Sequence, residues 1–184
     1  MAGLNRGLPM AVAAALLGAQ LGCGTPPAQT SPRLRLSPAS LGTSLALQQQ
    51  LTTTVRGQTQ QLDVLLEADS QSVRVAVINL GQTAARLEWD GTTMTESHAA
   101  WWPAAVSGER VLGDLQLMLW PASAVSAALP AGWSLETSRA LRVLSQHGQP
   151  VIRVQYDSAT AAELVNLREG YAIRVESRPL EAAP

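Results

Sequence analysis

The sequence contains no phenylalanine and no lysine, and only one cysteine occurs among its 184 residues. A single cysteine excludes an intrachain disulfide and any metal site built from several cysteines. Charged residues make up 15% of the chain and the formal net charge is -1, so it lacks the positive charge of nucleic-acid-binding proteins. Two histidines are too few to indicate a metal centre. We therefore predict no metal, no cofactor and no nucleic-acid partner.

Known catalytic motifs are also missing. The sequence has no G-x-S-x-G, no H-E-x-x-H and no glycine-rich phosphate loop after a predicted strand. His98 and His147 stand in turn-like segments without an obvious serine or aspartate partner. Because a Ser/His/Asp site can assemble from residues that are distant in sequence, a hydrolase stays open as the least favoured of three functions. We predict that the protein is not an enzyme.

Residues 1–22 have the three parts of an export signal. Arg6 and the amino terminus give a weakly positive start, and an apolar run follows from 10 to 19, which is too short for a comfortable membrane span. Small residues then lead to Cys23, the pattern of a bacterial lipobox, in which the leader is cut before the cysteine and its sulfur is acylated. Gln20 stands where that pattern usually has leucine. An ordinary signal peptide cut near Ala19 stays open as the alternative.

The segment 23–40 is rich in proline and serine and is predicted to be a tether. Acylation of Cys23 would attach the protein to a membrane, because two or three acyl chains anchor a protein stably. Residue 24 is glycine rather than aspartate, and the lipobox resemblance then implies sorting to the outer membrane, facing the periplasm. No apolar run of about 18 residues or more follows residue 23, so no second membrane span is predicted.

Apolar and polar residues alternate through most of residues 41–178, which is typical of strands with one buried face. Glycine-containing turns separate these segments at intervals of roughly 10–14 residues. The pattern predicts about five strands, then a helical insert, then about five more strands, followed by a C-terminal tail at 179–184. The fold class is therefore mainly β (α+β), with sequential hairpins as the simplest topology.

The helical insert extends from Ser107 to Leu129. An apolar stripe with helical spacing predicts one amphipathic helix, Ser107 is a plausible N-cap, and Pro121 ends the helix and opens a second, shorter one. An extended sheet with one apolar face must cover that face, and the insert is the expected cover. The stripe consists of Val111, Leu112, Leu115, Met118 and Leu119.

Three segments of the chain resemble the DUF3261 family of bacterial lipoproteins. They are LGTSLALQQQLT (41–52), GDLQLMLWPASAVSAALP (113–130) and the closing strands, and the D-L-Q-L-x-x-W-P motif at 114–121 is the most specific part. The resemblance covers roughly residues 33–178. It implies a LolA/LolB-like fold, which is a half-open antiparallel β-barrel of about 10–11 strands whose concave apolar face takes up acyl chains beneath a helical lid.

The candidate binding residues are apolar. Tryptophan suits an apolar site with one wet edge, and methionine adapts to variable acyl chains. Ordinary core packing is the alternative for each of these residues. Asp114, Glu163 and Glu169 are interpreted as surface residues, although Asp114 could instead tie the helix to a strand arginine. The predicted cavity residues are Trp89, Trp101, Trp102, Leu112, Leu115, Met118, Leu119 and Trp120.

The sequence therefore favours an outer-membrane-anchored periplasmic lipoprotein that binds or transfers an amphiphile in an apolar cavity. The resemblance implies lipoprotein acyl chains or an aryl-polyene-type lipid as ligand, and a periplasmic carrier protein as a possible partner. The alternative is a structural or interaction lipoprotein of an envelope complex whose core is filled. A cavity between the helix and the sheet would distinguish the two.

Overall fold

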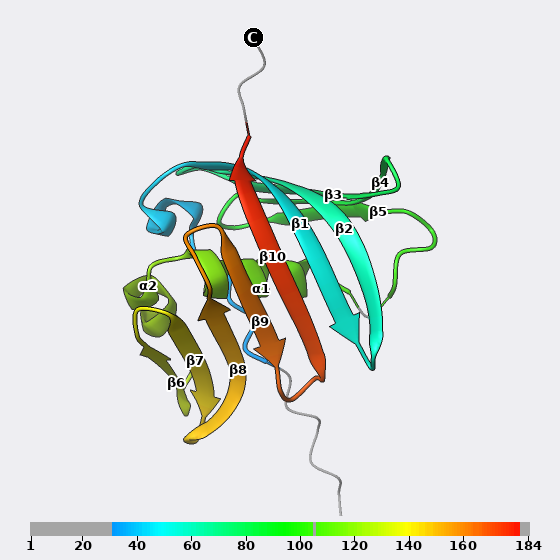
Figure 1. The fold of residues 1–184 in the computed structure, drawn as a ribbon. Helices are drawn as coiled ribbons and strands as arrows, with labels where there is room; N and C mark the ends of the chain where they lie inside the picture. The colour runs from blue at the N-terminus through cyan, green and yellow to red at the C-terminus, as the bar shows by residue number, and fades with distance from the viewer. Residues whose placement is uncertain (1–30, 105, 181–184) are drawn as a thin grey trace, which may run out of the picture.

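The computed structural model describes residues 31–104 and 106–180, and within them ten strands form a single antiparallel sheet (Figure 1). This confirms the mainly-β prediction of five strands on each side of a helical insert. The strands are β1 (Leu45–Val55), β2 (Gln58–Ala68), β3 (Val73–Asn79), β4 (Gln82–Trp89), β5 (Met94–His98), β6 (Trp133–Thr137), β7 (Leu141–Gln146), β8 (Gln149–Tyr156), β9 (Ala161–Asn166) and β10 (Tyr171–Pro179).

The strand order is β5-β4-β3-β2-β1-β10-β9-β8-β7-β6. Each half of the sheet is a run of sequential hairpins, and the pairing of β1 with β10 joins the halves from Leu47–Pro179 to Val55–Tyr171. The sheet is not closed, because β5 and β6 at its two edges do not pair with each other. The open ten-stranded sheet agrees with the coarse prediction of an antiparallel sheet that stops short of a complete barrel.

One face of the sheet, here called the inner face, carries the core. Alternation places Val64 and Leu66 of β2 beside Val77 and Val75 of β3 on this face, and all four side chains are buried. The other face carries mainly polar side chains at the intervening positions, as expected for an antiparallel sheet with one solvated side. The inner face therefore fixes where an apolar site could lie.

The helical insert forms as predicted. Helix α1 (Gly108–Leu119) begins after Ser107, whose side-chain oxygen accepts a hydrogen bond from the Arg110 N–H at 3.3 Å. Pro121 separates α1 from the short helix α2 (Ala122–Ala127). Among the described residues, neither helix has the length and apolar character that a membrane-spanning helix requires.

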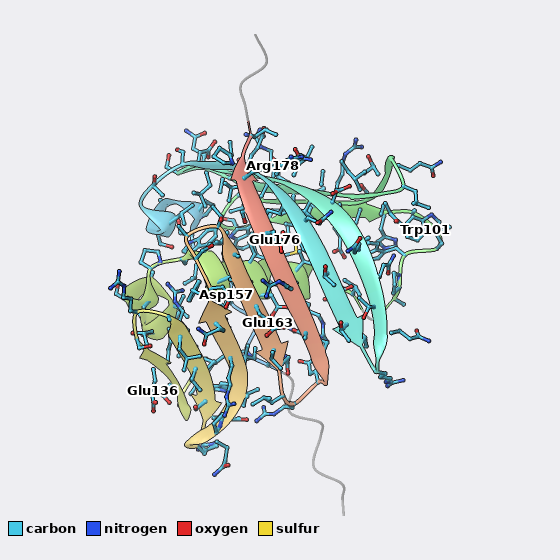
Figure 2. The ribbon with its side chains drawn as sticks, in the orientation of Figure 1. Trp101, Glu136, Asp157, Glu163, Glu176 and Arg178 are labelled. Carbon is cyan, nitrogen blue, oxygen red and sulfur yellow. The ribbon has the colours of Figure 1, made fainter. Side chains whose placement is uncertain are left out.

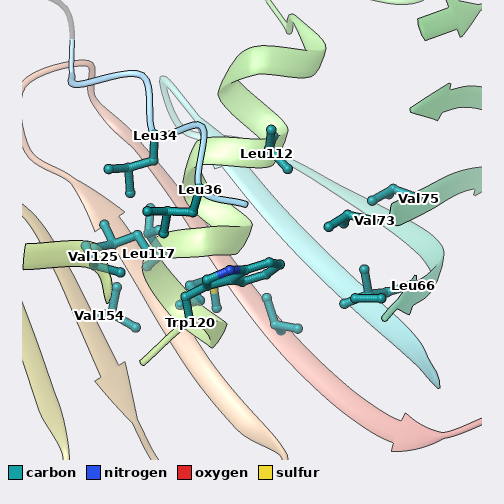
Figure 3. Packing of buried hydrophobic residues seen from close by; sticks show 14 of the residues in the cluster. Leu34, Leu36, Leu66, Val73, Val75, Leu112, Leu117, Trp120, Val125 and Val154 are labelled. Atoms are coloured by element: carbon teal, nitrogen blue, oxygen red, sulfur yellow. The ribbon is translucent and has the colours of Figure 1, made fainter. Parts of the chain in front are cut away.

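The segment 31–41, here called the strap, contributes to the core. Leu34 and Leu36 are buried in the same cluster as α1 and the inner face (Figure 3). Leu41 belongs to this cluster too, and the 3-10 helix η1 (Pro38–Leu41) ends the strap. A tether up to residue 40 was predicted because its prolines exclude a helix. The alternation of Arg33 and Arg35 with the two leucines was the signal that this part is packed against the domain.

Candidate functional site

The polar residue in the middle of the helix motif is Gln116, which is fully buried. Its Nε2 donates to the Leu36 carbonyl at 2.9 Å, and its Oε1 accepts from the Leu36 N–H at 2.9 Å. The amide thus satisfies both backbone groups of a strap residue, as a neighbouring strand would. Because an unsatisfied buried amide is costly, this pair fixes the strap on α1.

Two buried tryptophans complete the attachment of the strap. The Trp89 indole N–H donates to the Leu36 carbonyl at 2.8 Å, and the Trp120 indole N–H lies 3.3 Å from the Ser37 carbonyl and 3.1 Å from Ser40 Oγ. Both indole rings are nearly inaccessible to solvent. Their polar edges are therefore occupied by the strap, and their area belongs to the core.

A polar network surrounds the first residue of the strap. Tyr171 of β10 donates its hydroxyl to Asp114 Oδ2 of α1 at 2.8 Å, and the Asn166 amide donates to the same hydroxyl at 3.2 Å. Asn166 also donates to Ser31 Oγ at 3.0 Å, and Ser31 donates to Glu169 Oε1 at 3.0 Å. The network thereby connects the strap, α1 and the β9–β10 turn.

The charges of this network shift its ionisation. Burial raises the pKa of Asp114 to about 7, although the hydrogen bond from Tyr171 and the positive charge of Arg110 oppose the change. Burial also acts on Glu169, but its ion pair with Arg110 and the hydrogen bonds from Ser31 outweigh it and lower the pKa of that carboxyl. Asp114 is the group whose charge changes near neutral pH.

The interpretation of Asp114 and Glu169 as ordinary surface residues was wrong. Asp114 is partly buried and accepts a hydrogen bond from Tyr171 of β10, and the side chain of Glu169 is 20% exposed and ion-paired with Arg110. The alternative for Asp114, a link from helix to sheet, has the right geometry, but the partner is a tyrosine. Tyr171 lies 57 residues away in the sequence, and no local pattern predicts that contact.

A small apolar cavity lies between the start of α1 and strands β3–β5. Its volume is about 20 Å³, which is room for about one water molecule. Val77, Leu87, Trp102 and Val111 are among its lining residues. Trp102 and Val106 of the segment after β5 form part of its wall, and the Trp102 indole donates to the Val106 carbonyl at 2.9 Å.

Half-buried apolar side chains continue along the inner face towards the β1–β2 turn. Leu51 of β1 pairs with Leu62 of β2, and Ile173 of β10 lies diagonally beside Leu51 on the same face. All three side chains are partly accessible to solvent, whereas Val64, further along β2, and Val175, further along β10, are buried. We call the cavity together with Leu51, Leu62 and Ile173 the open side of the inner face.

The predicted cavity residues are distributed between the core and the open side. Trp102 lines the cavity, and Trp101 beside it is 51% exposed. Leu115 and Leu119 are half-buried and pack against the core. The remaining four, Trp89, Leu112, Met118 and Trp120, are buried in the core cluster. The lining residues of β3 and β4 were not predicted, since their strand pattern is that of any buried face.

The two histidines have no catalytic partners among the described residues. His98 lines the cavity with Glu96 and Ser97, but its ring contacts only the Ala99 carbonyl, at 3.3 Å from Nδ1. His147 occupies the tight turn between β7 and β8 and makes no side-chain hydrogen bond. In the described ranges, no three histidine, cysteine, aspartate or glutamate side chains are grouped as metal ligands would be. Cys23 and the predicted leader lie outside these ranges.

The comparison with known families gives one match. Residues 46–179 match the family described as "Protein of unknown function (DUF3261)". No curated protein matches the chain. The matched range includes all ten strands apart from the first residue of β1, both helices and the open side, and it excludes the strap.

Proposed function

The chain belongs to the DUF3261 family, and we propose that it is an outer-membrane-anchored periplasmic lipoprotein that binds an acyl chain of an amphiphile on its inner face. In this proposal acylated Cys23 provides the anchor, and the sheet is a LolA/LolB-like half-barrel with α1 and the strap over its concave face. The ligand is a lipid or a lipoprotein acyl group, and a periplasmic carrier is the partner that would deliver it.

The observation that carries the proposal is the unequal packing of the two sides of α1. On the strap side, Leu112, Gln116 and Leu117 are almost completely inaccessible and the strap is fixed by hydrogen bonds. On the open side, Val111 borders a cavity, and Leu115 one turn later on the same side of the helix is only half-buried. Met118, three residues further on this side, is buried, so the half-covered area is confined to the first half of the helix. Apolar area that the fold leaves half-covered is available to an apolar ligand.

An acyl chain needs more room than a cavity of about 20 Å³ provides. Binding therefore requires Trp102 and Val106, or the start of α1, to move away from β3–β5. The contact that would break is the hydrogen bond from the Gly108 N–H to Glu96 Oε2, at 2.7 Å. Burial of the acyl chain would offset the free energy of this opening by roughly 0.8 kcal/mol per CH₂ group.

The filled-core alternative, a structural or interaction lipoprotein, has its own supporting observation. Trp120, Leu112 and Leu117 are packed with no gap that would accept a ligand beside them. A protein whose core stays closed would act through its surface. The two functions differ in whether the open side can enlarge.

The test uses the chain from residue 23 with Cys23→Ser, the form left by the predicted cleavage. All members of the buried cluster lie between Leu34 and Val175, so this form contains the complete core. Native mass spectrometry would detect co-purified lipid, and titration with a dansylated fatty acid would measure binding. We expect saturable binding with increased dansyl fluorescence. A protein that stays lipid-free and leaves the fluorescence unchanged would support the filled core instead.

A matched pair of variants on β2 locates the site. Leu62 and Leu65 are both half-buried leucines, but they point to opposite faces of the sheet. We expect Leu62→Glu on the inner face to weaken fatty-acid binding at least about tenfold, since it places a charge in an apolar site. Leu65→Glu on the outer face should retain binding. Equal effects of the two variants would place the ligand elsewhere.

A further inference from the structure

The ends of the strands form two rims that differ in chemistry. Following the pairing register, one rim contains the turns 55–57, 80–81, 99–103, 147–148 and 167–170, and we call it the apolar rim. The opposite rim contains the turns 69–72, 90–93, 138–140 and 157–160, and we call it the acidic rim. In Figure 1 the turns of the apolar rim run from the lower left to the right side of the sheet.

Every large apolar side chain that is exposed in the described part of the chain lies on the apolar rim. The four are Val55 (49% exposed), Leu80 (97%), Trp101 (51%) and Leu167 (48%), and each belongs to a different turn or loop. Figure 2 shows Trp101 on the loop after β5, away from the body of the sheet. Single exposed apolar residues are ordinary on a protein surface, but here all four lie on one rim, where a single apolar partner could contact them together.

The backbone of this rim gives a second, independent observation. Three of its hairpin turns have positive φ at both central residues, and the second of the two is glycine in each turn. The first central residues are Arg56 (φ 50°), Leu80 (φ 49°) and His147 (φ 48°). Such turns strongly favour asparagine, aspartate or glycine at that position. The strain has no structural benefit at Leu80, since its side chain is almost fully exposed. A hydrophobic side chain held at a hairpin tip despite backbone strain indicates a use outside the fold.

The two rims differ in the balance of their charged residues. The turns of the apolar rim contain Arg56 and Arg168, and their only acidic residue, Glu169, is ion-paired with Arg110. Three turns on the acidic rim contain an aspartate, namely Asp69, Asp90 and Asp157, of which Asp69 and Asp157 form ion pairs with Arg74 and Arg174. The fourth turn contains Arg139. A surface with negative charge would attract the first rim and repel the second.

We infer that the apolar rim is a membrane-docking surface that inserts Val55, Leu80, Trp101 and Leu167 into the headgroup region of a bilayer containing anionic lipid. Tryptophan and aliphatic side chains at exposed tips suit that interface, and Arg56 would lie near the phosphates. The docking surface is separate from the anchor and does not depend on amphiphile binding by the inner face.

The position of the chain entry agrees with this orientation. Ser31 is hydrogen-bonded to Glu169 and therefore lies at the apolar rim, whereas Leu180 donates to Ala46 at the acidic rim. Seven residues separate Ser31 from Cys23. A fully extended chain spans at most about 3.6 Å per residue, so an acylated Cys23 would keep this rim within about 29 Å of the membrane. This last point alone rests on the proposed acylation.

The experiment measures co-sedimentation of the Cys23→Ser form from residue 23 with phosphatidylcholine vesicles, with and without phosphatidylglycerol. We expect binding to the phosphatidylglycerol vesicles and a blue shift of tryptophan fluorescence. The double variant Leu80→Asn/Trp101→Ser should bind at least about tenfold more weakly, since two apolar side chains no longer leave water. Leu80→Asn suits the turn, so this part of the variant does not threaten folding.

Two arginine variants test the charge contribution. Arg56→Gln on the apolar rim should weaken binding to the vesicles that contain phosphatidylglycerol. Arg139→Gln is the matched control, because Arg139 is also exposed but lies on the acidic rim, and the variant should bind as the parent does. Equal loss from both variants would overturn the inference.

Other outcomes separate docking from the proposed function. Leu62→Glu, designed to weaken fatty-acid binding, should retain vesicle binding, and a loss of vesicle binding would attribute the lipid contact to the inner face. A parent protein that binds neither kind of vesicle overturns the inference. So does a double variant that binds vesicles normally but loses a dimer seen for the parent, because the rim would then contact a second copy.

Discussion

Replacing Asp114 by asparagine should change how the stability of the protein depends on pH. The pKa of Asp114 is raised from 3.8 to about 7, mainly by burial. Between these values the folded protein holds a proton that the unfolded chain has released. The free energy of unfolding must therefore fall as pH rises from about 4 to about 7, and it becomes flat above the folded pKa.

The size of the effect follows from the shift. Each pKa unit corresponds to 1.36 kcal/mol, so a shift of about three units makes the parent less stable at pH 8 than below pH 4 by up to about 4 kcal/mol from this group. Asparagine cannot ionise, and its Oδ1 can accept the Tyr171 hydrogen bond as Asp114 does. We expect Asp114→Asn to lack this slope and to be more stable than the parent at pH 8.

Urea unfolding at a series of pH values from 4 to 8 measures this difference directly. Glu169 does not interfere, because its pKa is lowered and the stability that it contributes is lost only as pH falls below its ordinary value of 4.5. Asp69→Asn on the acidic rim is the control: the pKa of Asp69 is lowered by its turn hydrogen bonds, so the slope above pH 4 should stay. If Asp114→Asn and the parent have parallel stability curves, Asp114 is not buried as described.

Two further predictions concern stability. Leu80→Asn should raise the free energy of unfolding by about 1 kcal/mol, measured by thermal unfolding, because asparagine tolerates the φ of 49° at which leucine is strained; a loss of stability would contradict the assignment of strain. Gln116→Ala should cost about 2 kcal/mol or more in urea unfolding, since the Leu36 N–H loses its buried partner, and an effect no larger than that of an exposed substitution would mean that the strap is not fixed there.

The sequence predicted those features that depend on neighbours along the chain. Alternation of apolar and polar residues located the strands, because successive side chains of a strand point to opposite faces. Ser107 and Pro121 located the helix ends, since an N-cap oxygen and a proline act on the adjacent turn. The number of strands on each side of the insert followed from the spacing of the turns.

Features that depend on distant partners were not predictable in this way. The pairing of β1 with β10 joins the two ends of the domain, and no sequence feature of either strand identifies the other as its partner. The Asp114–Tyr171 contact and the burial of Leu34 against α1 are of the same kind. The local sequence around a polar helix residue is the same whether its side chain faces solvent or a tyrosine from a strand that is distant in the sequence.

The hydrogen bonds of α1 determine which side of the inner face could open. Arg142 donates to the Leu117 and Trp120 carbonyls at 2.7 and 2.8 Å and so holds the C-terminal end of the helix to β7. Asp114 is held to β10, and the strap moves with the helix because Gln116 binds its backbone. Towards β3–β5, the helix is held by the hydrogen bond from the Gly108 N–H to Glu96 Oε2.

A tilt of the start of α1 away from β3–β5 therefore breaks the fewest directional contacts. It would enlarge the cavity beside Val111 and Trp102, at the edge of the inner face that borders the segment after β5. That segment carries Trp101, one of the residues proposed to enter the bilayer. Docking of the apolar rim and opening of the cavity would then act on the same segment, so an acyl chain could pass from the membrane to the inner face without crossing water.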